Sequence, residues 1–559
     1  MKKNDICTLK ITGLTSEGSG VGRTDEGMAV FVPLTAVGDV ISCKIVKVNK
    51  TYAFGIIDKM LEPSETRCEN SCGVYQKCGG CLFRHISYEA ELAAKEQAVK
   101  DAFTRLGGLD VPFEPILGCT ETERYRNKAQ YPLTYDANGK AVCGFFAPRS
   151  HRVVPCGDCL LQPKLFKELT DEICAYIDEK KLPVYDEKTG KGLVRHTYLR
   201  RGFHSGEVMV CLIVTKADTA AFKPLADKLC KKFPMIKSFV LNINPKATNV
   251  ITGERCITLA GSDHIEDTMC GKKISISPLS FYQVNTAQAE RLYGVAKKYA
   301  QLSGEDTLLD LFCGAGTVGL SMSDGIKKLI GGEIIPQAVE NAKKNAAANG
   351  VENAEFICGD SGEIAAALAA KGIRPDVIVT DPPRKGCDEQ TLSSIVKMSP
   401  KRIVMISCNP ATAARDCAYL CEHGYKAESA QAVDMFPRTK HVETVVLLSH
   451  KKPDGHINVK VEFGEGEGKV PLDNIAKRAE EYKPKERVTY KMIKEYIEAK
   501  YSFKVHTAYI AEVKRDLGLP MYDAPNAVEE LKQPRKHPTA EKVEAIKDAL
   551  RYFEIMEEI

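Results

Sequence analysis

The alternation of apolar and polar residues changes its period along the chain. Residues 1 to about 60 alternate short β-rich runs, such as 40–46 and 52–57, with glycine turns, among them Gly18 to Gly22. Short, evenly spaced strands with turn signals predict a small barrel of the oligonucleotide-binding (OB) type. A generic small β-barrel has the same spacing, so the pattern alone leaves that alternative open.

Farther along, strand-like runs begin to alternate with helical repeats. From about 276 onward this alternation predicts a doubly wound parallel sheet. Residues 87–106 carry Ala, Leu and Val at helical spacing, and 165–275 show alternating β runs, including 208–214 and 238–243, which predict a mixed sheet.

The end of the chain has a different pattern. A polar linker begins at 451 and contains Gly464, Gly466 and Gly468. Two short amphipathic helices are predicted at 489–500 and 507–517. Their many lysines fit RNA binding, and an appendage without such a role fits equally well.

These patterns predict a multidomain α/β protein, because 559 residues are too many for one core. We expect an OB-like barrel at 1–62, a central mixed α+β domain at 63–275 and a Rossmann-like domain at 276–450. A linker and helical extension of unknown role would occupy 451–559.

Charge and hydropathy narrow the class of protein. The net charge is only +4, so any basic surface must be local. No apolar run approaches the length of a membrane span, and we therefore expect a cytoplasmic protein, with no membrane partner and in monomeric form.

The cysteines are clustered. Eight of the 21 lie between positions 68 and 159: Cys68, Cys72, Cys78, Cys81, Cys119, Cys143, Cys156 and Cys159. Thiols on a tight glycine-containing loop at 72–81 predict a metal centre completed by a distal cysteine. Cys78, Cys81, Cys156 and Cys159 would suit zinc, whereas Cys72, Cys78 and Cys81 with one distal cysteine would suit an iron-sulfur cluster.

A nucleotide-like ligand is predicted at the carboxyl ends of the parallel strands. Gly314, Gly316 and Gly319 open a helix after the first strand, and the acidic Glu333 follows at the tip of the next. This turn fits both NAD and S-adenosylmethionine (SAM). Asp360 ends a third strand, where it can reach an adenine edge.

The next strand ends in Asp381-Pro382-Pro383-Arg384. The two prolines rigidify the strand edge, and methyltransferases that act on bases use such an edge, whereas dehydrogenases do not. Basic and aromatic residues interleave at 124–131, which favours RNA contact over a solvated charged strand.

Two further residues stand where chemistry is expected. Cys408 follows the apolar run 402–406 at a strand end, in Ser407-Cys408-Asn409-Pro410. Glu443 enters an otherwise apolar strand, which is costly unless the carboxyl is paired or functional. A buried cysteine more often packs in the core without reacting, so the position of Cys408 does not by itself identify a catalytic nucleophile.

Together these motifs resemble the RNA uracil-5-methyltransferase family, in particular the branch that carries a TRAM domain and an iron-sulfur cluster and methylates 23S ribosomal RNA. The resemblance covers about residues 1 to 450. It implies a TRAM barrel at the N-terminus, a [4Fe-4S] cluster on Cys72, Cys78, Cys81 and Cys159, and SAM contacts from Gln283, Phe312, Glu333, Asp360 and Asp381. Cys68 and Cys156 fall outside the matched ligand pattern.

The resemblance also assigns the chemistry. Uracil C5 is a poor nucleophile until a thiolate adds at C6, and its proton must afterwards be removed. Cys408 is the expected nucleophile and Glu443 the expected base, acting on a uracil flipped out of folded RNA. The alternatives are a tRNA substrate, a non-catalytic RNA-binding iron-sulfur protein, and an NAD-dependent enzyme, which the strand-end motifs disfavour.

Overall fold

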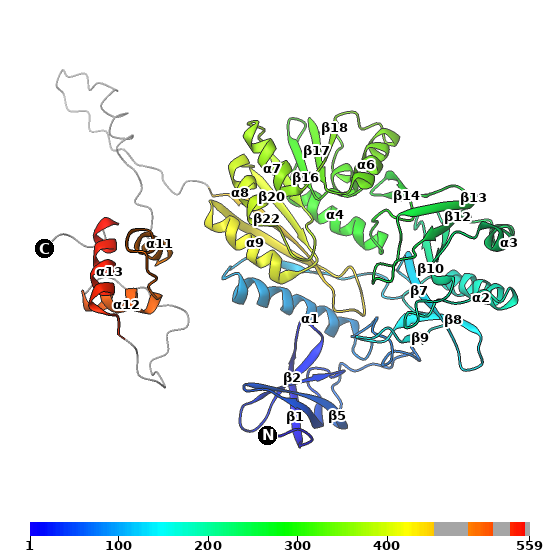
Figure 1. Ribbon diagram of the computed structural model, residues 1–559, viewed down its shortest axis with the longest axis horizontal. Coiled ribbons are helices and arrows are strands. Elements are labelled where there is room, and N and C mark those ends of the chain that lie inside the picture. The colour runs from blue at the N-terminus through cyan, green and yellow to red at the C-terminus, as the bar shows by residue number, and fades with distance from the viewer. Residues whose placement is uncertain (452–489, 518–536, 554–559) are drawn as a thin grey trace. The chain divides into compact units, whose positions relative to one another are not determined.

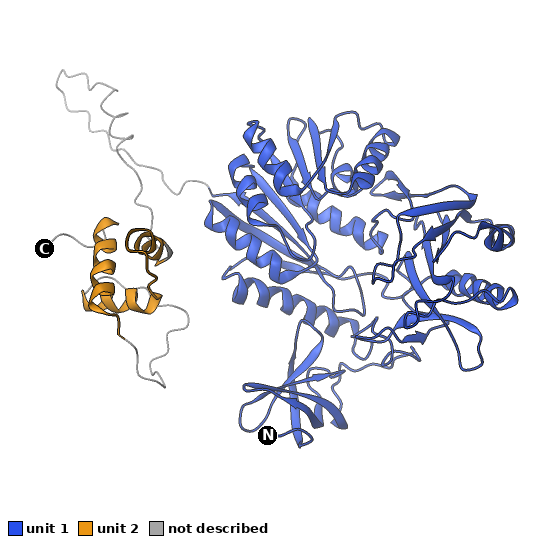
Figure 2. Cartoon of the chain, viewed as in Figure 1, with its two compact units in different colours: residues 1–455 blue, residues 456–559 orange. Residues whose placement is uncertain are grey.

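The computed structural model describes residues 1–451, 490–517 and 537–553. The chain forms two compact units, residues 1–455 and 456–559, which are coloured separately in Figure 2. The first unit contains a barrel and two large sheets (Figure 1).

The N-terminal region forms the predicted small barrel, which is closed by five strands. Its strands are β1 (Ile6–Leu14), β2 (Ser19–Arg23), β3 (Ala29–Pro33), β4 (Val40–Val48) and β5 (Tyr52–Glu62), and they close in the order β1-β2-β3-β5-β4. The alternate apolar positions of these strands fill the interior, among them Leu9, Ile11, Val30 and Ile41.

One sequence prediction in the barrel was wrong. The glycine-rich stretch 18–22 was expected to be a turn, but residues 19–23 form β2. A side chain on Gly20 would place its Cβ 1.9 Å from the Thr35 hydroxyl oxygen. Glycine is therefore needed for close packing inside a strand here.

The central region is built on a mixed seven-stranded sheet in the order β13-β12-β11-β10-β7-β8-β9. Only β11 and β12 pair in parallel. The strands are β7 (Lys128–Tyr135), β8 (Ala141–Phe146), β9 (Val153–Pro155), β10 (Val194–Arg201), β11 (Val208–Val214), β12 (Ile236–Ile243) and β13 (Arg255–Gly261). The hairpin β14 (Ile265–Met269) and β15 (Lys272–Ile276) follows.

Two helices of this region were not predicted from the alternating β runs. They are α2 (Lys164–Glu179) and α3 (Thr219–Lys232), which pack on the mixed sheet. The sequence of α2 does contain a helical pattern, because apolar residues recur at helical spacing and are all buried: Phe166, Leu169, Ile173 and Ile177.

The third sheet is doubly wound, as predicted. Its order is β18-β17-β16-β19-β20-β22-β21-β6, and β22 runs antiparallel to both neighbours. The strands are β6 (Phe113–Leu117), β16 (Thr307–Leu311), β17 (Lys328–Glu333), β18 (Ala354–Cys358), β19 (Val377–Thr380), β20 (Arg402–Ser407), β21 (Tyr425–Val433) and β22 (Glu443–His450).

Helices cover both faces of this sheet, with a separate apolar core on each side. One face carries α4 (Thr286–Ala300), α5 (Thr317–Ser321) and α6 (Pro336–Ala348). The other carries α7 (Ser361–Ala370), α8 (Glu389–Met398) and α9 (Pro410–Glu422).

A segment from far upstream completes this sheet. β6 pairs in parallel with β21, although it lies in the range assigned to the central domain. The helix α1 (Tyr88–Asp101) begins at its cap Ser87 and continues as a π-helical turn, η1 (Ala102–Leu106), which joins the same core as α9.

The second unit has three described helices, α11 (Tyr490–Tyr501), α12 (Thr507–Asp516) and α13 (Ala540–Tyr552). The first two occupy the stretches expected to be helical, and α13 was not anticipated. Ile497, Ile510 and Ile546 are part of a small buried core. Most of the predicted linker, with its glycines at 464–468, lies outside the described residues. None of the described helices is long and apolar enough to cross a membrane.

Candidate active site

The topology brings most of the predicted site residues to one edge of the doubly wound sheet. Phe312, Asp381 and Cys408 directly follow β16, β19 and β20, and Glu333 ends β17. Because β22 is antiparallel, its first residue, Glu443, also lies at this edge. The carboxyl ends of parallel strands are where open α/β sheets hold ligands.

The glycine turn after β16 is tied to Glu333. The amide of Gly314 donates to Glu333 Oε2 at 3.0 Å, and the amide of Ile335 donates to Oε1 at 2.8 Å. Phe312 has a φ of 68° and Gly316 a φ of 80°. A phenylalanine in the left-handed region is strained, which is typical of backbone held for function.

Asp360 and Gln283 flank this turn in different ways. Asp360 caps α7, since Oδ1 accepts from the amides of Gly362 and Glu363. The Gln283 side chain is hydrogen-bonded to Tyr293, and its backbone carbonyl accepts from Asn127 Nδ2 at 2.8 Å. Both residues are thus fixed in place before any ligand binds.

Two acids beneath the edge are held away from water. Asp310 is 1% exposed and Oδ2 accepts from the Gly319 amide at 2.8 Å, while Oδ1 has no hydrogen-bond partner. Burial raises the pKa of Asp310 to about 8, and the negative charges of Asp381 and Glu333 add to the shift. Burial likewise raises the pKa of Asp381 to about 7, although part of its surface is exposed. Asp310 was not predicted as a site residue. The sequence feature that could have identified it is an acidic residue within an otherwise apolar strand.

The local sequence explains how Cys408 is presented. Asn409 caps α9 by accepting from the Ala411 amide, and Pro410 occupies the first helical turn, so Cys408 is the single residue between strand and helix cap. Asn409 Nδ2 also donates to the Arg384 carbonyl at 3.0 Å. The Ser-Cys-Asn-Pro and Asp-Pro-Pro-Arg turns are therefore joined.

The Glu443 carboxylate acts electrostatically on the Cys408 thiol. Burial raises the pKa of the Cys408 thiol, the carboxylates of Glu443 and Asp381 raise it further, and Arg384 lowers it. Burial raises the pKa of Glu443 to about 8, with Asp381 adding to the shift and Arg384 opposing it. A nucleophilic thiolate requires cationic surroundings, and Arg384 is placed to supply them.

A cavity of about 560 Å³ opens onto Cys408. Cys408, Arg384 and His441 line one side, and residues of α1 and of the barrel segment 14–17 line the other. Lys440, beside His441, forms an ion pair with Glu17 of the barrel. Burial, followed by nearby cations, lowers the pKa of His441 to about 4, so this imidazole is neutral.

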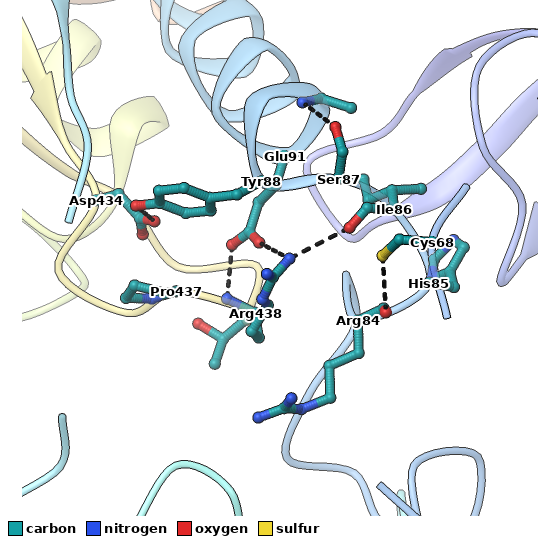
Figure 3. A network of polar contacts seen from close by, with 12 residues as sticks. Cys68, Arg84, His85, Ile86, Ser87, Tyr88, Glu91, Asp434, Pro437 and Arg438 are labelled. Atoms are coloured by element: carbon teal, nitrogen blue, oxygen red, sulfur yellow. Dashed lines mark hydrogen bonds and ion pairs between the residues drawn. The ribbon is translucent and has the colours of Figure 1, made fainter. Parts of the chain in front are cut away.

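A buried network holds the loop 434–442, which leads into Glu443. Lys95 Nζ of α1 donates to Glu91 and to Asp434, both at 2.7 Å, and all three side chains are almost fully buried. Figure 3 shows Glu91 facing the backbone amide and guanidinium of Arg438, and Tyr88 donating to Asp434. The predicted base therefore follows a loop that is fastened to α1.

The cysteines predicted to hold a metal line one cavity of about 120 Å³. Cys72, Cys78, Cys81 and Cys159 take part, as does Cys156. Cys68 does not line this cavity, and its thiol donates to the Arg84 carbonyl at 3.5 Å. Within the described part of the chain, no three His, Cys, Asp or Glu side chains are arranged to hold a single metal ion.

Comparison with known proteins agrees with this geometry. The family model described as tRNA (Uracil-5-)-methyltransferase matches residues 87–451, and the TRAM domain model matches residues 2–57. An RNA methyltransferase of Clostridium tetani, described as uncharacterized, is 42% identical over 450 residues, which cover 80% of this chain and 97% of that protein. Its counterpart in Halalkalibacterium halodurans is 41% identical over 452 residues, or 81% of this chain and 98% of that protein.

A solved structure is also similar. The Pyrococcus abyssi tRNA (uracil-54, C5)-methyltransferase in complex with S-adenosyl-L-homocysteine is 25% identical, with a TM-score of 0.63. The match covers 79% of this chain and all of that one. The chain therefore belongs to the tRNA (uracil-5-)-methyltransferase family of SAM-dependent RNA methyltransferases, and it carries an N-terminal TRAM domain.

Proposed function

We propose that this protein methylates C5 of a uridine in RNA through a covalent bond between Cys408 and C6 of the base. One observation carries the proposal: the Cys408 thiol and the Glu443 carboxyl group emerge next to each other, from the paired strands β20 and β22, at the edge of the sheet where ligands bind. The cavity of about 560 Å³ beside Cys408 supports the entry of a base flipped out of folded RNA.

The residues account for each bond that changes. The Cys408 thiolate adds to C6, which leaves an enolate whose C5 takes the methyl group from the sulfonium. Glu443, in its carboxylate form, then accepts the C5 proton, the C5–C6 double bond reforms and the thiolate is expelled. Glu443 is suited to this role because its pKa of about 8 lies close to neutral pH.

The methyl donor SAM supplies an electrophilic methyl group on a sulfonium. We assign its binding to Gln283, Phe312, Glu333, Asp360 and Asp381. The glycine turn after β16 leaves the backbone accessible at Gly314, where a Cβ would meet nothing within 4 Å, and Glu333 presents a carboxylate for ribose hydroxyls. The charge of Asp381 acts on both Cys408 and Glu443, which supports a place for this residue beside the reacting groups.

We propose 23S ribosomal RNA as the substrate. The support is the motif set shared with the branch that combines a TRAM barrel with clustered cysteines. A tRNA is the second candidate, favoured by the likeness to the P. abyssi enzyme, which is named as a tRNA (uracil-54, C5)-methyltransferase. Mapping 5-methyluridine in a deletion strain separates the two: loss from 23S rRNA alone is expected, and loss confined to tRNA contradicts the proposal.

We further propose a [4Fe-4S] cluster on Cys72, Cys78, Cys81 and Cys159. The fit is chemical: five thiols line one small cavity, and two cationic side chains, Arg84 and Arg126, line it as well and can balance a negatively charged cluster. A cluster is several ångströms wide, so its ligands do not converge as they would around one ion. Iron and acid-labile sulfide in the anaerobically purified protein are expected, whereas stoichiometric zinc without iron contradicts the cluster.

A further inference from the structure

Two cationic side chains lie directly opposite each other in the central sheet. Lys128 of β7 and Arg200 of β10 are partners in an antiparallel pair of strands, which lie side by side in Figure 1. Like charges at such positions repel and destabilise the pair. Arg126, two residues before Lys128, adds a third positive charge that acts on Lys128.

These three side chains have no acidic side-chain partner among the described residues, and Arg126 also borders the cavity of the proposed cluster. Across residues 1–451, 490–517 and 537–553, none of them forms an ion pair with an acidic group of the described structure. Arg200 is 1% exposed, and its Nε, like the Nε of Arg126, is buried without an acceptor. Burial, and then the charges of Arg200 and Arg126, lowers the pKa of Lys128 to about 8. Backbone carbonyls compensate Arg200 in part. Desolvating cations without an acidic partner is still costly, so the fold maintains the cluster at a loss in stability.

The cluster borders both halves of the candidate active site. Asn127, between Arg126 and Lys128, donates to the carbonyl of Gln283, and Arg200 Nη1 donates to the carbonyl of Ser280 at 3.0 Å. The guanidinium carbon of Arg126 lies 5.9 Å from the ring centroid of Phe436, in the loop that leads to Glu443. An anion bound here would therefore lie near the segments that carry the donor-binding and base residues.

We propose that Arg126, Lys128 and Arg200 form a subsite for a phosphodiester group of the substrate RNA next to the flipped uridine. This inference rests on the proposed function for the identity of the substrate. A phosphodiester carries the negative charge that the cluster lacks, and Arg and Lys are the usual partners of phosphate. Such contacts position the strand without reading its sequence.

The test compares Lys128→Gln with the parent protein, both carrying Cys408→Ala so that no methyl transfer is needed. Binding of a fluorescently labelled, uridine-rich oligoribonucleotide is followed by anisotropy over a range of salt concentrations. Lys128→Gln is expected to weaken binding several-fold and to make the dependence of log K on log salt shallower by about 0.7. Lys128→Arg should restore both, and Lys140→Gln, at an exposed lysine in the turn before β8, should change neither.

Two further measurements distinguish a ligand subsite from a structural lysine. Lys128→Gln should raise the melting temperature of the RNA-free protein, because it removes a like-charge repulsion between the half-buried Lys128 and the buried Arg200. RNA affinity of the parent should fall above pH 8 as Lys128 loses its proton, and Lys128→Arg should not show this fall.

Two experimental outcomes would overturn the phosphodiester subsite. A lower melting temperature with unchanged RNA binding would make Lys128 structural and overturn the subsite. A loss of S-adenosylhomocysteine affinity in place of RNA affinity would assign the cluster to the donor's carboxylate and also overturn it. If RNA binding responds as expected while the protein with Cys408 restored transfers no methyl group to uracil, the proposed function fails and the subsite stands.

Discussion

Cys408 and Glu443 lie one residue beyond the Ser407–Thr444 pair of two antiparallel strands, so a thiol and a carboxyl group emerge from one edge of the sheet although 34 residues separate them. The single antiparallel strand of this edge, β22, makes the pairing possible. A parallel strand in its place would present its first residue at the opposite edge.

Replacing Cys408 with alanine is expected to abolish methyl transfer and leave SAM affinity unchanged, because the thiol forms the bond to C6 and makes no contact that the donor needs. Transfer of radiolabelled methyl groups to RNA and calorimetric titration with SAM measure the two quantities. Cys421→Ala, a partly buried cysteine at the end of α9, is the matched control and should retain activity. Full activity in Cys408→Ala would refute the nucleophile.

Replacing Glu443 with glutamine should stop the reaction one step later. The methylated adduct would still form but could not lose its C5 proton, so Cys408 would stay bonded to the RNA. The expected result is a protein–RNA band that survives denaturing electrophoresis in the presence of SAM and disappears when Cys408 is also changed. Rapid turnover by Glu443→Gln would show that another group is the base.

Glu443 also links stability to pH. Its pKa rises from 4.5 to about 8 on folding, so the folded protein binds more protons than the unfolded chain between these values. Stability contributed by the neutral carboxyl is complete below pH 4.5 and is lost as pH rises through 8. Glu443→Gln should therefore raise the melting temperature most at the alkaline end of this window, whereas the exposed Glu422→Gln should give no such trend.

The network on α1 predicts a large and specific loss of stability. Lys95→Met leaves the buried carboxyl of Asp434 without a cation and Glu91 with only the more distant guanidinium of Arg438, and it should cost about 3–5 kcal/mol. Lys100→Met, on the same helix but in a partly exposed pair with Glu96, should cost less than about 1 kcal/mol. Denaturant unfolding measures both, and equal losses would contradict the role of the network.

Single cysteine variants test the assignment of the metal ligands. Cys81→Ser and Cys159→Ser are expected to lose most of the iron, whereas Cys68→Ser should keep it, since Cys68 lies outside the shared cavity. Iron analysis and visible absorption give the answer. Cys156→Ser decides which of the two distal cysteines is the fourth ligand. If Cys156→Ser loses the iron and Cys159→Ser keeps it, Cys156 is the ligand in place of Cys159.

The barrel and the doubly wound sheet could be predicted because their signals are local. Strand period, glycine turns and acids at strand ends each lie within a few residues, and they identified Glu333, Asp381 and Cys408 as strand-end residues. The helices α2 and α3 were missed among β runs even though α2 carries apolar residues at helical spacing. The strand β2 was mistaken for a turn because a glycine needed for packing resembles a glycine needed for bending.

Such local signals could not predict contacts between residues that are far apart in the sequence. The sequence around Lys95 does not indicate that its ammonium group forms an ion pair with Asp434. The sequence around 113–117 does not indicate that this strand pairs with 425–433. The raised pKa of Cys408 was equally hidden, because it depends on burial and on two acids, Glu443 and Asp381, which two other strands bring close.

The pairing of β6 with β21 has a consequence for how the chain is made. When the ribosome has added residue 300, the edge strand β6 has already been synthesised. Its partner strand β21 is synthesised more than a hundred residues later. The barrel and the central sheet contain all their strands by then, so they can fold during synthesis. The catalytic sheet must wait, and a fragment beginning at 276 would lack both β6 and the helix that fastens its loop. Such a fragment should collapse without reaching a cooperative fold, and adding residues 87–117 in trans should restore one.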